Sequence, residues 1–209
     1  MATQDNNVTK SVSSPRLMKH SNQLSSEIKE GILVDSNSTS IKGKIMGLLA
    51  CLGVISPFPF YYWLWTQPQT WVNLWGKGSD PCKVMAMVSH FLKLVQFASL
   101  LAVSTLSWPP PFYFWPLFIF GQFLNFRVYQ LLGESGTYYG VRFGKTIPWV
   151  TDFPFGVIKD PQYVGSVMSL LACLSWVPYL YILLWVLGYA FMIHLESKED
   201  PSTRAEAIS

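Results

Sequence analysis

The sequence is short of charge. Only 13% of its 209 residues are charged, about half the share that is usual in a soluble domain. Acidic residues are scarcest, and Asp80 is the only one between Asp35 and Glu134. Three long stretches contain no Asp, Glu, Lys or Arg at all: 45–76, 94–126 and 161–195. A helix needs about 20 apolar residues to cross a bilayer core. Each stretch is long enough, and a chain of this size cannot bury three such runs in a water-soluble core.

Cysteine and histidine are also sparse. Cys51, Cys82 and Cys173 have neither metal-ligand nor CxxC spacing, which argues against a disulfide framework. The three histidines are scattered, and the chain has no HExxH, Gly-x-Ser-x-Gly or kinase signature. No metal is therefore expected. The formal charge of +3 is too small to indicate a nucleic-acid partner.

The charge-free stretches predict an all-α fold, a polytopic transmembrane helical bundle with four to five membrane segments. Spans are expected at about 46–66, 84–106 and 112–132. Pro57 and Pro59 lie within the first span, and each removes a helix donor. This span is therefore expected to be bent, or alternatively to dip into the membrane without crossing it.

The last charge-free stretch is too long for one ordinary span. As a single helix it would measure about 50 Å, whereas the bilayer core is about 30 Å thick. Trp176-Val177-Pro178 lies near its midpoint, so a C-terminal helical hairpin is predicted.

Residues 1–45 differ from the rest of the chain. They are rich in Ser, Asn and Thr, and they lack an apolar run long enough for a signal peptide. This composition predicts a disordered N-terminal tail that precedes a membrane-embedded domain at 46–209. An organelle transit peptide is the alternative, against which the four acidic residues of this segment count.

The third expected span changes character halfway. Its second half carries Gln122 and Asn125, which are three residues apart and share one helix face. Polar groups inside a membrane usually face a bundle interior or a wet cavity. Two interpretations stay open: the wall of a polar pocket, or a helix that is leaving the membrane.

Two polar regions follow the third and the last spans. The connection 133–160 is dense in glycine and aromatic residues, and glycine lets the backbone approach a ligand closely. After the last span, Glu196, Glu199 and Asp200 place three carboxylates within five residues.

Motifs in the C-terminal half resemble those of a known family. The segments 133–140, 153–155 and 160–166 read GESGTYYG, FPF and DPQYVGS. In this order, before a hairpin and an acidic tail, they resemble the phosphatidylethanolamine N-methyltransferase family, and 46–209 is similar nearly throughout to its plant-type members. The resemblance implies transfer of methyl groups from S-adenosyl-L-methionine to phosphatidyl-N-methylethanolamine and phosphatidyl-N,N-dimethylethanolamine, giving phosphatidylcholine. It also implies a phospholipid substrate in the bilayer and residence in the endoplasmic reticulum membrane as a multi-pass protein.

The resemblance also implies residues that bind the cofactor. The family's Gly-x-Gly in the third span corresponds to Ile119-Phe120-Gly121, where only one glycine is kept. Its Glu-Glu-Pro corresponds to Glu199-Asp200 before Pro201, or the role falls to Glu196. The Pro-x-Tyr-x-Gly element contributes Pro161, Tyr163 and Gly165.

The chemistry of methyl transfer suggests further roles. The methyl donor is a sulfonium and the acceptor an ammonium, so carboxylates are expected where they meet, and Glu134, Glu196 and Glu199 are the candidates for catalysis. Basic side chains are candidates for binding the lipid phosphate or the carboxylate of the cofactor: Arg127, Arg142, Lys145 and Lys159. The aromatic rings of Tyr138, Tyr163 and Trp149 are candidates for holding a methylated ammonium. A carboxyl methyltransferase of prenylated cysteine and a small membrane transporter subunit are the alternatives.

Overall fold

The structure is a computed structural model that describes Gln23, Lys29 and residues 40–206. The chain divides into two compact units, Met1–Ile45 and Met46–Ser209. Most of the predicted disordered tail at 1–45 lies outside the described residues. The second unit holds the helices discussed below.

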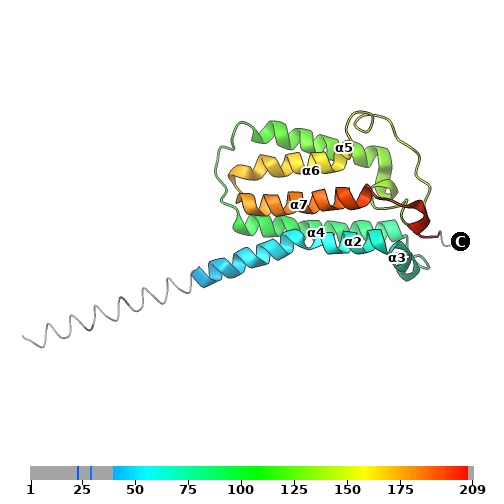
Figure 1. Ribbon diagram of the computed structural model, residues 1–209. Helices are drawn as coiled ribbons and strands as arrows, with labels where there is room; N and C mark the ends of the chain where they lie inside the picture. The colour runs from blue at the N-terminus through cyan, green and yellow to red at the C-terminus, as the bar shows by residue number, and fades with distance from the viewer. Residues whose placement is uncertain (1–22, 24–28, 30–39, 207–209) are drawn as a thin grey trace, which may run out of the picture. The chain divides into compact units, whose positions relative to one another are not determined.

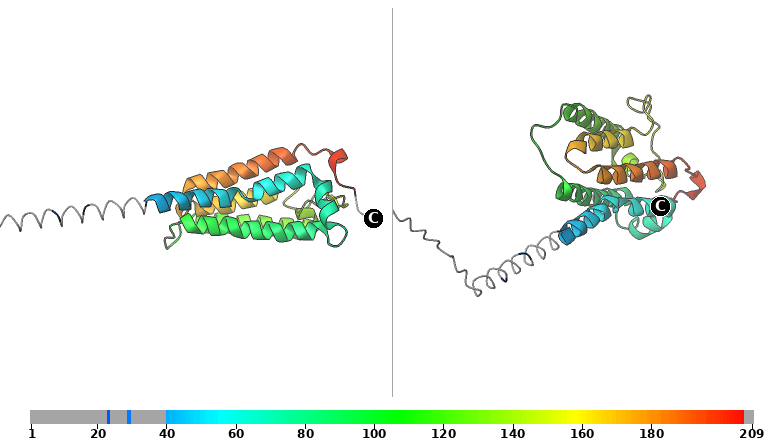
Figure 2. Two further views of the ribbon diagram at one scale, coloured as in Figure 1. Left: turned by 90° about the horizontal axis from the view of Figure 1, so that it is seen from below. Right: turned by 60° about the vertical axis from the view of Figure 1, so that its left-hand side comes forward.

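The described part of the chain is helical and contains no strand, which confirms the predicted all-α bundle. Figure 1 shows α4, α5, α6 and α7 running side by side, and the two views of Figure 2 agree. The α-helices are α2 (Pro57–Thr66), α3 (Pro68–Trp75), α4 (Pro81–Val103), α5 (Phe114–Thr137), α6 (Pro161–Ala172) and α7 (Tyr179–Glu196). Two short 3-10 helices follow α6 and α7: η1 (Cys173–Ser175) and η2 (Pro201–Thr203).

Proline sets where several helices begin. It stands at the start of α2, α3, α4 and α6, where its missing N–H costs no hydrogen bond and its fixed φ suits a helix. At the start of α4, Asp80 caps the helix by accepting a hydrogen bond from the Cys82 N–H at 2.9 Å. The helix that leads into α2 is interrupted at Ser56, directly before Pro57. The predicted disturbance at these prolines is thus confined to one residue.

Among the described residues, three helices are long and apolar enough to cross a membrane: Ser40–Thr66, Pro81–Val103 and Tyr179–Glu196. They match the first two predicted spans and the second arm of the predicted hairpin. Helix α5 is also long, at 24 residues, but its second half is polar and Gly133 interrupts it with a φ of 62°. Helix α6 has only 12 residues.

The C-terminal hairpin is confirmed. Helix α6 ends at Ala172, and α7 begins after Pro178. The tip of the hairpin is fastened to the connection between α4 and α5, where the Thr105 N–H donates to the Trp176 carbonyl at 2.8 Å and the Trp176 indole donates to the Ser107 carbonyl at 3.0 Å. The start of α6 and the end of α7 therefore lie at the same end of the bundle, opposite the tip of the hairpin (Figure 1).

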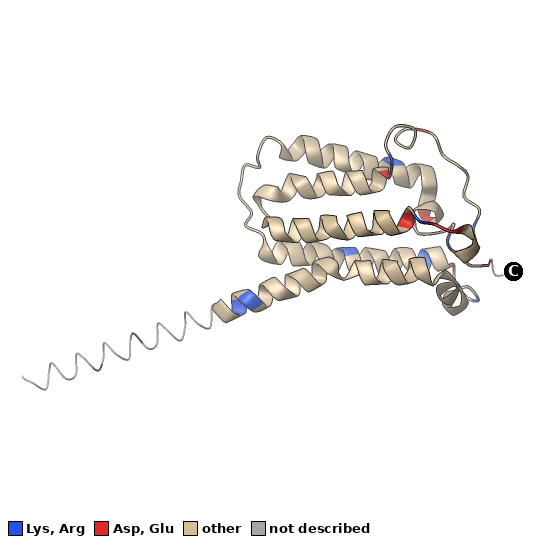
Figure 3. Ribbon diagram, viewed as in Figure 1, with Lys and Arg blue, Asp and Glu red and all other residues tan. Residues whose placement is uncertain are grey.

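Charged residues of the second unit gather at the end of the bundle opposite the tip of the hairpin. Figure 3 shows most Asp, Glu, Lys and Arg of the unit where α7 ends and α6 begins, and along the segments that adjoin them. The helix middles are largely free of charge. This distribution suits a bundle whose middle lies in lipid and whose chemistry occurs at one end.

Candidate active site

A cavity of about 640 Å³ opens among the helices at the charged end of the bundle. We call it the polar cavity. Side chains from α2, α4, α5, α6, α7 and the loop after α5 line it, among them Tyr61, Lys93, Tyr139, Tyr163, Glu196 and Glu199. Helices distant in sequence thus contribute to one space.

Glu196 is the carboxylate that the fold positions most firmly in this cavity. Its Oε1 accepts hydrogen bonds from the Tyr139 hydroxyl at 2.7 Å and from the Tyr163 hydroxyl at 2.8 Å. The three residues come from the end of α7, the loop after α5 and the first turn of α6. The hairpin brings the end of α7 and the start of α6 together, as the sequence predicts.

Tyr139 is held in an unusual backbone conformation. Its φ is 55°, in the left-handed region that residues with a Cβ seldom adopt and that costs about 1–3 kcal/mol. Burial, followed by the charge of Glu196, raises the pKa of the Tyr139 phenol well above its ordinary value of 10.0. The phenol therefore keeps its proton and remains a hydrogen-bond donor.

Tyr138 also lines the polar cavity. Its hydroxyl lies 3.3 Å from Nε2 of His90, and the two rings are 5.8 Å apart. Burial raises the pKa of Tyr138 to about 12. This side chain thus offers the cavity a neutral aromatic surface at physiological pH.

The polar half of α5 forms part of the cavity wall, as one of the two interpretations predicted. Gln122 and Asn125 both line the cavity. Each also bonds to α6: the Gln122 side-chain amide donates to Ser169 at 2.9 Å, and the Ser166 hydroxyl donates to Asn125 at 3.4 Å. The polar face therefore joins two helices and borders the site.

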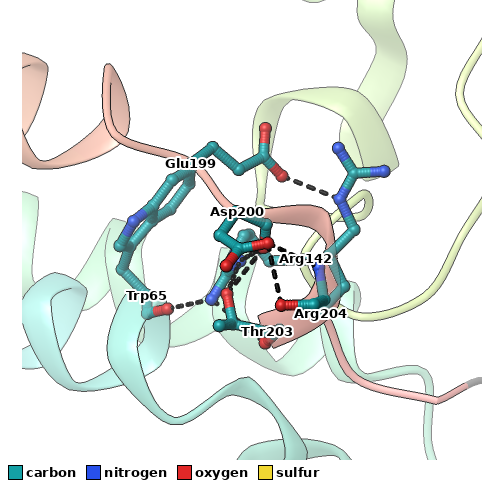
Figure 4. Close-up of polar contacts among 7 residues, drawn as sticks. Trp65, Arg142, Glu199, Asp200, Thr203 and Arg204 are labelled. Atoms are coloured by element: carbon teal, nitrogen blue, oxygen red, sulfur yellow. Dashed lines mark hydrogen bonds and ion pairs between the residues drawn. The ribbon is translucent and has the colours of Figure 1, made fainter.

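Arg142 serves as an anchor for the C-terminal segment. Its side chain is buried, with Nη1 donating to the Thr203 hydroxyl at 2.9 Å and Nη2 donating to the Trp65 carbonyl at 2.5 Å. The guanidinium lies 4.8 Å from the Trp65 ring centre, and the Arg142 carbonyl accepts from the Ala205 N–H at 2.8 Å. Figure 4 shows Arg142 between Trp65 and the segment that follows Glu199. These contacts engage both terminal nitrogens of Arg142, which sequence analysis made a candidate for binding an anion.

Lys145 is paired with a carboxylate. Its Nζ donates to both oxygens of Asp80, at 2.8 and 2.6 Å, and to the Ser135 hydroxyl at 3.1 Å. Although burial opposes the charged form of Asp80, the bonds from Lys145 and from the Cys82 N–H outweigh it and lower the pKa of Asp80. The pair ties the loop after α5 to the start of α4, and Lys145 lies outside the polar cavity.

Glu199 lines the cavity, whereas Asp200 does not. Oε1 of Glu199 accepts from Nε of Arg204 at 2.8 Å. Asp200 caps η2 by accepting from the N–H and the hydroxyl of Ser202, and these bonds lower its pKa. Of the two residues that resemble the family's acidic pair, Glu199 is the one that lines the polar cavity, and Figure 4 shows its contact with Arg204.

Other predicted site residues lie away from the cavity. Ile119 and Phe120 are exposed on the side of α5, and Trp149 is 93% exposed in the loop before α6. Arg127 donates to Gln130 of its own helix at 3.0 Å. The remaining predicted residues outside the cavity lining are Gly121, Glu134, Lys159, Pro161 and Gly165.

Several cavity residues were missed by sequence analysis: Tyr61, Ser89, His90, Lys93 and Tyr189. They lie within apolar segments, where aromatic and small side chains look like ordinary packing. Lys93 is the exception, because a charged residue inside a span is a recognisable signal of function. Within residues 40–206, no cluster of three or more His, Cys, Asp or Glu side chains could hold a metal ion.

Comparison with known proteins gives consistent results. A family model described as phospholipid methyltransferase matches residues 113–205. The chain is 74% identical over 164 residues to phosphatidyl-N-methylethanolamine N-methyltransferase of Arabidopsis thaliana, a match that covers 78% of this chain and all of that protein. It is 46% identical over 57 residues to phosphatidylethanolamine N-methyltransferase A of Dictyostelium discoideum, which covers 27% of each. No solved structure matches the chain significantly.

Proposed function

Because the chain belongs to the phospholipid methyltransferase family, we propose that it methylates the amines of phosphatidyl-N-methylethanolamine and phosphatidyl-N,N-dimethylethanolamine, giving phosphatidylcholine. The proposed methyl donor is S-adenosylmethionine. The observation that carries the assignment of the site is Glu196, a carboxylate held by two tyrosine hydroxyls in the polar cavity.

The polar cavity suits two cationic reactants. Its lining includes Glu196 and Glu199, and carboxylates favour positive charge. Its volume of about 640 Å³ lies in the range of small-molecule and cofactor sites. When bound, S-adenosylmethionine supplies a methyl group carried on a sulfonium cation. Glu196 and Glu199 are the proposed partners of its positive charges.

Glu196 is the proposed proton acceptor. A lipid ammonium must lose its proton before its nitrogen can accept a methyl group. Tyr139 and Tyr163 both bond to Oε1, and in residues 40–206 no hydrogen bond engages Oε2. The two tyrosines thus orient the carboxylate and leave one oxygen for the ammonium proton.

Aromatic rings around the cavity are proposed to hold the methylated amine. Tyr61, Trp65, Tyr138, Tyr163 and Tyr189 all line the cavity. Each ring face attracts a cation by about 0.5–2 kcal/mol. This attraction persists after every methyl addition, whereas an ammonium loses one N–H donor at each step. The same wall can therefore bind both proposed substrates.

The test is direct incorporation of methyl groups into lipid. Full-length protein in liposomes receives labelled S-adenosylmethionine and, in separate reactions, phosphatidylethanolamine or its N-methyl or N,N-dimethyl derivative. Label is expected in the products of the last two lipids. A chain that labels none of the three would overturn the proposal. Label in a farnesylated cysteine, supplied in a parallel reaction, would instead support a carboxyl methyltransferase.

The proposed location is the endoplasmic reticulum membrane. Three helices in the described part of the chain that are long and apolar enough to cross a membrane support a membrane location, and the endoplasmic reticulum is what the resemblance to the plant-type enzymes implies. A fluorescent fusion is expected to follow an endoplasmic reticulum marker and to stay with membranes after an alkaline wash. Release by that wash, or a pattern matching another organelle, would contradict the proposal.

A further inference from the structure

Lys93 places an ammonium group within a predicted membrane span. It belongs to α4, and its Nζ donates to the Tyr189 hydroxyl of α7 at 3.0 Å. The same Nζ lies 4.8 Å from the centre of the Trp185 ring and 5.4 Å from that of Tyr189. Among the described residues, no carboxylate forms an ion pair with it. A charge in this environment is costly and indicates function.

Lys93 is also the available cation of the polar cavity. Only one other Lys or Arg lines this cavity in the described part of the chain, and that is Arg142. The terminal nitrogens of Arg142 are engaged with Trp65, Thr203 and the Asp200 carbonyl. Lys93 bonds to one neutral hydroxyl and keeps further N–H donors for an anion.

A second cavity begins where Lys93 lies. Its volume is about 360 Å³, and we call it the apolar cavity. Most of its lining is hydrocarbon or aromatic, including Leu100, Phe118, Leu170 and Val177. The two cavities share four lining residues: Lys93, Phe97, Gln122 and Tyr189. The ammonium thus lies at the junction of a polar and an apolar space.

We propose that Lys93 binds the phosphate of the phospholipid substrate, with an acyl chain in the apolar cavity and the amine in the polar cavity. The assignment rests on the proposed function, and charge complementarity selects the occupant. A phospholipid carries its phosphate anion between its amine and its hydrocarbon chains. The protein offers partners in the same order: the carboxylate of Glu196, the ammonium of Lys93 and the apolar cavity.

A continuous set of contacts connects the two charged groups. Lys93 donates to the Tyr189 hydroxyl, and the rings of Tyr189 and Tyr163 pack edge to face with centres 5.3 Å apart. The Tyr163 hydroxyl donates to Glu196 at 2.8 Å. Tyrosine rings thus separate the proposed phosphate site from the proposed proton acceptor. Lys93 acts by binding, and it selects amines that carry a phosphate.

The test compares four proteins in mixed micelles of stated lipid content: wild type, Lys93→Met, Lys93→Arg and Lys83→Met. Lys83 belongs to the same helix, is exposed and lies outside both cavities. Lys93→Met is expected to raise the KM for phosphatidyl-N-methylethanolamine by roughly 10- to 100-fold, the usual weight of a hydrogen bond to a charged group. Lys93→Arg is expected to recover most of this loss. The KM for S-adenosylmethionine should stay within about twofold in all four proteins.

The outcomes separate the two proposals. An inactive wild type overturns the proposed function. If the wild type is active and the lipid KM is equal in Lys93→Met and Lys83→Met, the phosphate assignment alone is overturned. The same holds if Lys93→Arg binds the methyl donor but loses as much lipid affinity as Lys93→Met.

A further variant tests whether the apolar cavity binds an acyl chain of the lipid. Cys173 lines only the apolar cavity, so Cys173→Phe should raise the KM for a dioleoyl substrate more than for a dihexanoyl one. An equal effect on both lipids would exclude an acyl chain from this cavity.

Discussion

Gly121 of α5 and Gly165 of α6 meet backbone to backbone. A Cβ atom on Gly121 would lie 2.5 Å from the Gly165 carbonyl oxygen, and a Cβ atom on Gly165 would lie 2.6 Å from the Gly121 carbonyl oxygen. Small residues allow this close approach between membrane helices. The two glycines, which the resemblance implies as cofactor-binding residues, thus set the distance between the helices that carry Asn125 and Tyr163.

Alanine at either glycine is expected to push α5 and α6 apart. Because the obstacle is backbone, Gly121→Ala and Gly165→Ala should each destabilise the protein by about 1–3 kcal/mol and lower methyltransferase activity. Thermal unfolding in detergent measures the first effect and labelled lipid the second. Gly78→Ala is the control, since a Cβ there meets nothing within 4 Å. Equal melting temperatures for all three variants would refute the close contact.

Removing the charge of Glu196 is expected to abolish most activity. Glu196→Gln keeps the shape of the side chain but cannot take a proton, so kcat should fall about 10²- to 10⁴-fold. Tyr163→Phe, which loses one orienting hydroxyl, should have a smaller effect.

The control for Glu196→Gln is Asp152→Asn, which removes an acid from an exposed loop position. Steady-state rates at saturating donor and lipid make the comparison. A Glu196→Gln protein with the rate of the control would remove Glu196 from the mechanism.

Replacing Arg142 is expected to release the C-terminal segment. Lysine keeps the charge but cannot reproduce the fork of bonds to Trp65 and Thr203. Arg142→Lys should therefore increase amide hydrogen exchange at residues 200–205. Activity should also fall, because the segment that follows Glu199 is no longer held in place. Arg127→Lys, on the side of α5, is the matched control. Unchanged exchange at Ala205 in Arg142→Lys would contradict the anchoring role.

The pair of Lys145 and Asp80 gives a defined dependence on pH. The pKa of Asp80 is lowered on folding, so its contribution to stability is present above the ordinary Asp pKa of about 3.9 and is lost as the pH falls through the lower folded value. The pKa of Lys145 is raised on folding by the bond to Asp80, against the effect of burial. Its contribution is therefore present below about pH 10.4 and is lost as the pH rises through the higher folded value.

Asp80→Asn tests this window, because asparagine can still cap α4 but carries no charge. The difference in melting temperature between wild type and variant should be constant between about pH 5 and pH 9 and should shrink outside that range. Since the pair is about one-third exposed, the difference should correspond to at most about 1 kcal/mol. A difference that persists at pH 2 would show that the charge pair is not its cause.

The sequence predicts the parts of this fold that follow local rules. Pro178 and the length of the apolar stretch predict the hairpin, and the spacing of Gln122 and Asn125 predicts the polar wall. These features depend on helix periodicity and on the chemistry of proline, and both can be read from neighbouring residues. The bilayer adds a length rule that limits where spans begin and end.

The partners of long side chains could not be predicted in the same way. Arg142 and Lys145 occur in a polar loop, where a cation appears free to bind phosphate. Their partners, Thr203 and Asp80, are 61 and 65 residues away, and only the packing of several helices brings them close. For the same reason, the bond between Tyr139 and Glu196, separated by 57 residues, has no local signal.

The exposed loop around Trp149 separates the groups that meet at Glu196. A chain divided at this loop would leave Tyr139 on one fragment, and Tyr163 and Glu196 on the other. Neither fragment alone would contain the complete carboxylate site. Activity regained by co-expressing the two fragments would therefore report that they assemble in the membrane. A cut in this loop would therefore test whether the helical hairpin can join the remaining helices without a covalent link.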